Sequence, residues 1–194
     1  MPTFEFLYDF SSPYSYLAAT QVEALAQRTG AQVVYRPIVL GGLFKAIGSG
    51  PPMKNSVKNV WMGKDLQRWA ELYGVPFRFS PHFPLNTIAA MRLVLVDEKH
   101  AAQVTKEAYS AMWSEGLNLS EPQVISTIAA RAGLDAKSAM AAIENQAIKD
   151  RLRANTDDAI ARGVFGAPTF FVGDEMHWGN DRLQFVESAL RRIA

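Results

Sequence analysis

The stretch of the chain best suited to chemistry is a cluster of three hydroxyl side chains: Ser11, Ser12 and Ser15. It follows residues 4–8, a short aromatic run that favours a strand. After this point the apolar residues recur at helical intervals as far as Gly30. Ser12 then occupies the expected N-cap, and Pro13 takes the first helical position, where its missing N–H costs nothing. Free backbone N–H groups and the positive end of a helix dipole therefore face the space beside Ser12, which favours an anion there.

Composition limits what this cluster can do. The chain has 194 residues, a formal net charge of +1 and no cysteine. Disulfides, a thiol nucleophile and a redox dithiol are thereby excluded, so any sulfur chemistry must come with a ligand. The balanced charge predicts neither a nucleic-acid partner nor a membrane surface. No secretory signal pattern is evident and no apolar run approaches the length of about 20 residues that spans a bilayer, so we expect a cytoplasmic protein.

Three blocks of secondary structure are expected along the chain. The helix after Ser12 leads to a second strand at residues 31–38, which makes a β-α-β unit with parallel strands. The middle of the chain has a helical pattern, in which residues 120–123 are a plausible capping box and Asp135 a plausible N-cap. The last block contains two short strands around the turn pair Gly173-Asp174, and a helix follows them.

This order predicts an α/β protein with a thioredoxin-like fold. The β-α-β and β-β-α halves would form one discontinuous domain from residues 1–50 and 164–194, and a large all-helical insertion would cover residues 51–163. With 48% apolar residues, the chain can fill a core of this size.

Four separated motifs resemble those of one enzyme family, the 2-hydroxychromene-2-carboxylate isomerases. They stand in the family's order at residues 9–17, 64–70, 163–169 and 173–183. This family is grouped with the kappa-class glutathione transferases in the DsbA-like branch of the thioredoxin fold. The resemblance covers essentially the whole chain, and it implies glutathione as a catalytic cofactor and a homodimer as the assembly.

The resemblance also implies roles for individual residues. Ser12 matches the serine that hydrogen-bonds the glutathione sulfur, in place of the first cysteine of a Cys-x-x-Cys turn. A helix N-terminus and a hydroxyl donor favour a thiolate, as they do for cysteines whose pKa is lowered from about 8.5. On its residues alone, Ser12 would be an ordinary N-cap. Pro168 matches the cis-proline opposite the active turn, and Ala167 before it would bind the cysteinyl part of glutathione through its backbone.

Other positions match the ends of glutathione. Asn180 and Asp181 would receive its γ-glutamyl end, although an Asn or Asp at the start of a helix is first of all a cap. Lys58 would bind the glycine carboxylate of glutathione, or it would be an ordinary exposed lysine on the protein surface. The expected substrate contacts are Ser49, Asn55, Trp61 and Trp178. Ser49 stands where related enzymes usually have asparagine, which leaves its contact and the substitute role of Asn55 open.

The implied reaction interconverts 2-hydroxychromene-2-carboxylate and trans-o-hydroxybenzylidenepyruvate, so the substrate would be a small aromatic oxo-acid. Reversible thiol addition would turn a double bond into a single bond and let it rotate. Two alternatives stay open: a kappa-type transferase or peroxidase, and a binding protein of DsbA-like fold without catalysis. A metal site is not expected, because His82, His100 and His177 lack metal-ligand spacing.

Overall fold

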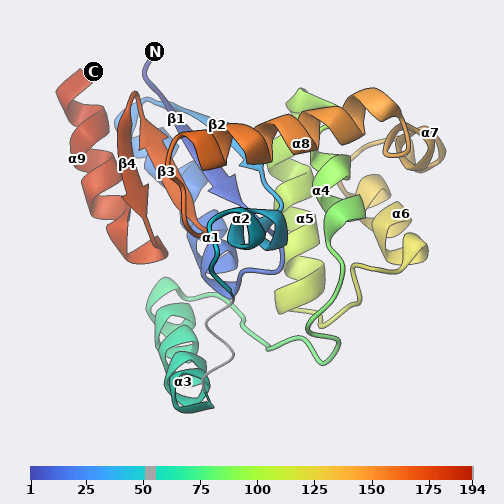
Figure 1. Cartoon of the computed structure of the whole chain (residues 1–194), viewed down its shortest axis with the longest axis horizontal. Helices are drawn as coiled ribbons and strands as arrows, with labels where there is room; N and C mark the ends of the chain where they lie inside the picture. Colours follow the sequence, from blue (N-terminus) through green and yellow to red (C-terminus); the bar gives the residue numbers. More distant parts are fainter. Residues whose placement is uncertain (51–55, 194) are drawn as a thin grey trace.

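A four-stranded mixed sheet forms the centre of the molecule (Figure 1). The computed structural model describes residues 1–50 and 56–193. The strands are β1 (Thr3–Tyr8), β2 (Gln32–Pro37), β3 (Thr169–Val172) and β4 (Glu175–Trp178). Their order in the sheet is β2-β1-β3-β4, with β1 parallel to β2 and the other two pairs antiparallel. This mixed sheet with its helices confirms the α/β class and has the strand arrangement of the thioredoxin-like fold that the sequence predicts.

Helices cover both faces of the sheet because the strands alternate their side chains. Phe6 and Phe170 belong to the main core, which α1 (Pro13–Thr29) and α9 (Leu183–Ile193) complete on one face. Leu7 and Phe171 point to the other face, where they meet Ala159. That residue lies on α8 (Gln146–Ala161), which runs beside β2 and carries the chain back to β3. Both faces are therefore buried against helices.

The helices between β2 and β3 follow the predicted helical pattern, except that the first of them, α2, is not predicted from the sequence. They are α2 (Leu40–Ala46), α3 (Ser56–Tyr73), α4 (Ile88–Val94), α5 (Ala101–Trp113), α6 (Pro122–Arg131) and α7 (Ala136–Ala142), followed by α8. Short 3₁₀ turns occur at Glu98–His100 and Asn180–Arg182. Asp135 caps α7 as expected, because its side chain accepts a hydrogen bond from the Ser138 N–H at 2.8 Å. The hairpin at Gly173-Asp174 is also confirmed.

The predicted capping box at residues 120–123 is wrong. The N-cap of α6 is Glu121, and no side chain caps that helix. Ser120 is held instead by Asn118, whose Oδ1 accepts from its backbone N–H at 3.0 Å and from its hydroxyl at 2.6 Å. Ser120 thus takes part in an Asx-type turn and does not cap α6.

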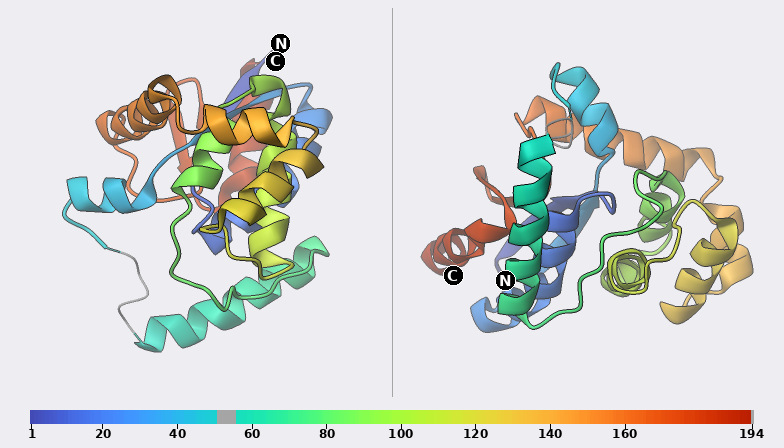
Figure 2. Two further views of the ribbon diagram at one scale, coloured as in Figure 1. Left: turned by 90° about the vertical axis from the view of Figure 1, so that its right-hand side faces the viewer. Right: turned by 90° about the horizontal axis from the view of Figure 1, so that it is seen from below.

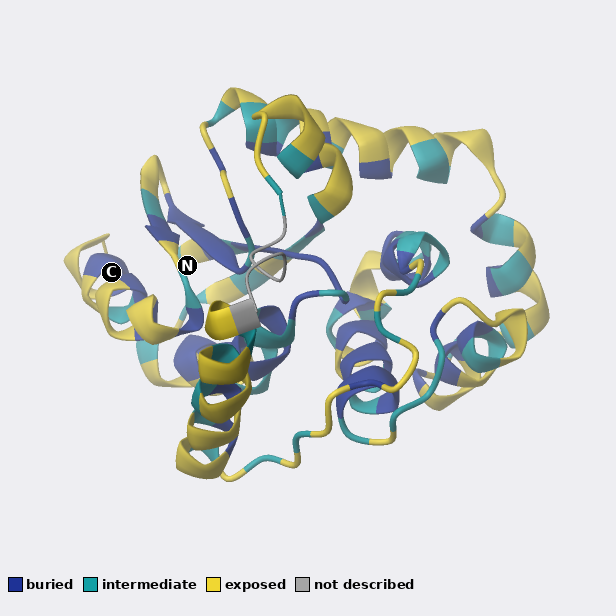
Figure 3. Cartoon of the chain, turned by 60° about the horizontal axis from the view of Figure 1, so that its bottom comes forward, coloured by how far each residue is buried: buried dark blue, intermediate teal, exposed yellow. Residues whose placement is uncertain are grey.

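Helix α3 lies to one side of the sheet, near one end of α1 (Figures 1 and 2). Its residue Leu66 is buried toward the core, whereas its outer face is exposed along most of its length (Figure 3). In the part of the chain that the structure describes, no helix is both long and apolar enough to cross a membrane. The chain from Gly74 to Thr87 returns from α3 to α4 with no regular helix or strand and passes the N-terminal end of α1.

Candidate active site

The turn between β1 and α1 has the conformation that the sequence predicts. Ser12 is the N-cap of α1, with an extended backbone (φ −94°, ψ 112°) and Pro13 directly after it. Its Oγ accepts a hydrogen bond from the backbone N–H of Ser15 at 3.2 Å. Ser12 is only 6% exposed, and α1 is a helix of 17 residues. A hydroxyl is therefore held at the positive end of a long helix dipole, where an anionic sulfur would be stabilised.

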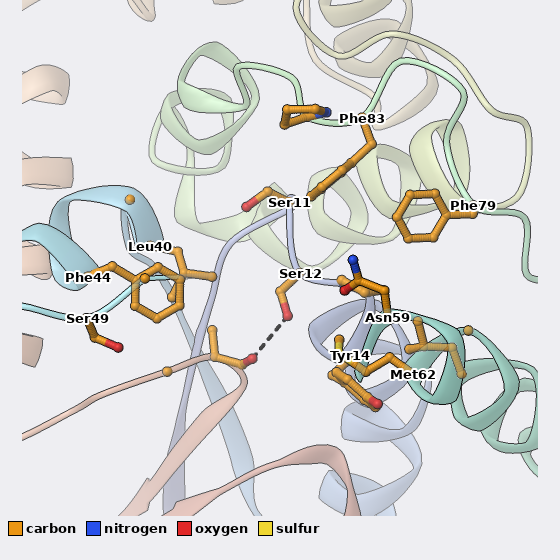
Figure 4. A pocket seen from close by; sticks show the side chains of 18 of the residues that line it. Ser11, Ser12, Tyr14, Leu40, Phe44, Ser49, Asn59, Met62, Phe79 and Phe83 are labelled. Carbon is orange, nitrogen blue, oxygen red and sulfur yellow. Dashed lines mark hydrogen bonds between the residues drawn. The ribbon is translucent and has the colours of Figure 1, made fainter. Parts of the chain in front are cut away.

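The second part of the site comes from the segment before β3. The Ser12 hydroxyl donates a hydrogen bond of 3.0 Å to the carbonyl oxygen of Ala167 (Figure 4). The peptide bond between Ala167 and Pro168 is cis, as predicted. The Pro168 carbonyl in turn accepts from the Gly179 N–H at 2.9 Å, just beyond β4. The bond between Ser12 and Ala167 joins the two halves of the thioredoxin-like unit, and the bond between Gly179 and Pro168 ties the end of β4 to the segment before β3.

A cavity of about 1110 Å³ opens in front of this turn (Figure 4). Its lining is mainly apolar and comes from the turn, α2 and the residues after it, α3, the segment before α4, the segment before β3 and the end of β4. The lining residues are Ser11, Ser12, Pro13, Tyr14, Leu40, Gly41, Phe44, Ser49, Gly50, Asn59, Met62, Gly63, Leu66, Gln67, Phe77, Phe79, Phe83, Pro84, Phe165, Gly166, Ala167 and Trp178. No Lys, Arg or His is among them in the described part of the chain. Such a lining suits an aromatic ligand held by few polar groups.

An aromatic wall of this cavity is the main feature that the sequence does not reveal. Phe79 and Phe83 pack edge to face with ring centroids 5.3 Å apart, and Phe77 stacks on Trp113 at 5.9 Å. The Trp113 Nε1–H donates to the carbonyl oxygen of Phe10 at 2.8 Å, next to the active turn. The three phenylalanines lie in an irregular segment without periodicity, and all three pack on Trp113, which makes them one wall.

The predicted substrate contacts are only partly brought together. Ser49 and Trp178 line the large cavity, and the Trp178 ring packs on Phe165 with centroids 4.8 Å apart. Trp61 lies outside that lining. It borders a separate surface hollow of about 410 Å³ on α3, with Val57, Lys58 and Met62. Asn55 is outside the described residues. The substrate roles of these residues stay predictions.

Asn180 and Asp181 lie in the short 3₁₀ turn before α9 and do not line the cavity. Asn180 is 3% exposed; its carbonyl oxygen accepts from the Tyr73 hydroxyl at 3.2 Å. Its side-chain Nδ2 is buried and has no hydrogen-bond partner within the described structure. Asp181 is half-exposed and pairs with Arg182 at 2.7 Å. An unsatisfied buried donor is costly, so this position suits a ligand that supplies an acceptor.

One tyrosine joins α1 to α3 beside the cavity. The Tyr14 hydroxyl donates to Asp65 Oδ2 at 3.0 Å. Burial and the neighbouring Asp65 carboxylate raise the pKa of Tyr14 well above its usual range, so the phenol stays neutral at ordinary pH. Among residues 1–50 and 56–193, no three or more His, Cys, Asp or Glu side chains are grouped so that they could hold a metal ion. Among the described lining residues, the positive end of the α1 dipole is the feature that favours a bound anion near Ser12.

Known proteins resemble this chain along nearly its full length. The model of the DSBA-like thioredoxin domain matches residues 3–191. The 2-hydroxychromene-2-carboxylate isomerase of Pseudomonas putida is 36% identical over 97% of this chain and 94% of its own. A solved structure of a 2-hydroxychromene-2-carboxylate isomerase has 36% identity and a TM-score of 0.90, covering 98% of this chain and 95% of that one.

More distant relatives carry a glutathione transferase name. Human glutathione S-transferase kappa 1 is 28% identical over 97% of this chain and 90% of its own length. The whole-length match to both groups agrees with the capped serine turn and the cis-proline segment described above. The chain therefore belongs to the DSBA-like thioredoxin family and, within it, to the group of the 2-hydroxychromene-2-carboxylate isomerases.

Proposed function

We propose that the protein is a glutathione-dependent isomerase that interconverts 2-hydroxychromene-2-carboxylate and trans-o-hydroxybenzylidenepyruvate. The observation that carries this proposal is the position of the Ser12 hydroxyl, buried at the N-terminus of α1 and at the edge of a large aromatic cavity. The isomerases that match the full chain support the reaction, and the kappa transferases support glutathione as the thiol.

Features of the chain fit glutathione at this place. Ser12 offers a hydroxyl and a helix dipole to the sulfur, and the buried Nδ2 of Asn180 lacks a partner within the described structure. Ala167 would present its backbone to the cysteinyl part, Asp181 its carboxylate to the γ-glutamyl ammonium, and Lys58 its ammonium to the glycine carboxylate. When bound, glutathione supplies a thiolate that adds reversibly to a conjugated double bond.

The cavity residues have separate tasks in this scheme. The phenylalanine wall and Trp178 bind the aromatic ring of the oxo-acid by stacking and exclude water from it. Ser49 is a candidate for a polar group of the substrate. Ser12 holds the proton of its own hydroxyl toward the sulfur and so favours the charged form of the thiol.

The direct test is the isomerisation rate of dialysed protein with and without added glutathione. We expect a negligible rate without the thiol and a saturable rise when it is added, with glutathione recovered unchanged. Full activity without any thiol would contradict the proposal. A stoichiometric, stable glutathione conjugate as the product would favour the kappa-type transferase alternative instead.

A further inference from the structure

One buried carboxylate connects three parts of the cavity and takes no part in the scheme above. Asp9 is 4% exposed and is absent from the cavity lining. Its Oδ1 accepts hydrogen bonds from the Ser11 backbone N–H at 2.9 Å and from the Thr87 hydroxyl at 2.8 Å. Its Oδ2 accepts from the Leu40 backbone N–H at 2.9 Å. The three donors belong to three different segments that surround the cavity.

Each of these bonds fixes a segment that the site needs. The bond to Ser11, together with the bond from the Ser12 N–H to the Asp9 carbonyl at 3.0 Å, shapes the turn that presents Ser12. The bond to Leu40 caps the start of α2, since the N-cap residue Val39 supplies no side-chain cap. Helix α2 is short and contains two adjacent glycines, so it depends on such outside support.

The bond from Thr87 secures the third segment. Thr87 is the last residue before α4 and is 5% exposed. Its hydroxyl does not cap α4 and donates to Asp9 instead. Thr87 thereby fixes the end of the irregular segment that carries the aromatic wall at Phe77, Phe79 and Phe83.

We propose that Asp9 is a positioning residue of the site, which sets the Ser12 turn, the α2 wall and the end of the aromatic wall relative to one another. An ionised carboxylate can accept all three hydrogen bonds at once, whereas the side-chain amide of asparagine has only one acceptor atom. The proposal rests on the proposed function for its catalytic consequence. Its structural consequence holds for the protein without any ligand.

The variant Asp9→Asn should keep two of the three hydrogen bonds and remove the third. Its amide oxygen should replace Oδ1, where two donors converge, so that the new NH₂ group faces the Leu40 N–H. A donor then opposes a donor, and α2 loses its cap. We expect faster amide hydrogen exchange in peptides that cover α2. We also expect kcat/KM for the oxo-acid to fall between about 10- and 100-fold, the range that a misplaced site produces.

Two substitutions of Thr87, which donates a hydrogen bond to Asp9, test the role of the same carboxylate. Thr87→Val keeps the shape of the side chain and removes one donor, so we expect a smaller loss of kcat/KM and normal exchange in α2. Thr87→Ser restores the hydroxyl and should restore activity. This pair decides the question if Asp9→Asn fails to fold. Asp135→Asn is the matched control, because Asp135 caps α7 and is not part of the cavity.

The measurement is amide hydrogen exchange by mass spectrometry on the free protein, combined with steady-state kinetics at saturating glutathione. Exchange that rises in α2 but stays normal in α5 and α7, together with the expected kinetic loss, supports the proposal. Wild-type exchange and kinetics in Asp9→Asn would overturn it, and so would a uniform rise of exchange across all helices. If the unmodified protein neither binds glutathione nor isomerises the oxo-acid, the proposed function fails while hydrogen exchange still decides the role of Asp9.

Discussion

The Ser12 hydroxyl and the Ala167 carbonyl oxygen form a hydrogen bond of 3.0 Å across 155 positions of sequence. The single proton of the Ser12 hydroxyl thus points at Ala167, while the Ser12 Oγ accepts a hydrogen bond from the Ser15 N–H. A thiolate beside Ser12 would compete with the neutral carbonyl for that proton. Because a charged acceptor forms the stronger bond, we expect the hydroxyl to turn from Ala167 to the sulfur when glutathione binds.

Gly166 leaves space that the Trp178 ring fills. A Cβ atom at Gly166 would lie 2.5 Å from Trp178 Nε1, which no real contact tolerates. Trp178 is 51% exposed, so the ring can move outward and the fold should survive. We expect Gly166→Ala to raise the KM for the aromatic oxo-acid several-fold, with a change in stability of no more than about 1 kcal/mol.

Steady-state kinetics and thermal unfolding check this prediction. The double variant Gly166→Ala/Trp178→Ala removes the clash, so its KM should equal that of Trp178→Ala alone. A KM for Gly166→Ala equal to that of the unmodified protein would show that the Trp178 ring does not contact the substrate.

The ion pairs of Glu5 should make the free energy of unfolding depend on pH. Its carboxylate accepts from Arg36 at 2.6 Å and from Arg162 at 2.9 Å, and it is 22% exposed. Burial pushes the pKa of Glu5 up, but the hydrogen bonds from Arg162 and Arg36 outweigh this and hold the pKa below its ordinary value of 4.5. The folded state thus gains stability above pH 4.5, and this gain disappears as the pH falls through the lowered pKa.

We therefore expect Glu5→Gln to lower the free energy of unfolding at pH 7 by about 1 to 3 kcal/mol. The difference from the unmodified protein should vanish at acid pH. Denaturant titrations at a series of pH values measure both effects. Glu98→Gln is the control, because Glu98 is 82% exposed and pairs only at the surface with Arg151. Equal pH dependence in Glu5→Gln and the unmodified protein would refute the argument.

Lys58 tests the expected contact with the glycine carboxylate of glutathione. If this contact forms, Lys58→Gln should weaken glutathione binding by about two- to fivefold, the effect of one partly exposed ion pair. The rate at saturating glutathione should not change, because the contact is remote from the sulfur. Calorimetry measures the affinity, and Lys64→Gln on the same exposed helix is the matched control. Equal affinities of the two variants would remove Lys58 from the site.

The local signals in the sequence predict much of the fold. Ser12 and Pro13 define the start of α1, and Gly173 defines the hairpin, because capping and turn chemistry depend on neighbouring residues. The sequence does not predict α2. Its two glycines disfavour a helix, and it forms because Asp9 caps Leu40 from another segment and because α2 packs on α8.

The candidate site is predictable to a similar extent. The resemblance to a family selects Ser12 and Ala167, which the structure joins by a hydrogen bond, and the cis form of Pro168. It does not select the aromatic wall, because Phe79 and Phe83 lie in an irregular segment and their rings pack on each other and on Trp113, which is distant in the sequence. Long-range packing of this kind leaves no local pattern in a sequence.

The pH at which bound glutathione ionises tests the central claim, that Ser12 stabilises its thiolate. Thiolate absorbance is followed against pH in complexes of glutathione with the unmodified protein and with Ser12→Ala. The account predicts that the thiol bound to the unmodified protein ionises at a lower pH than free glutathione, and that Ser12→Ala moves the transition upward by about one pH unit or more. Identical transitions in the two proteins, with glutathione bound equally well, would contradict it.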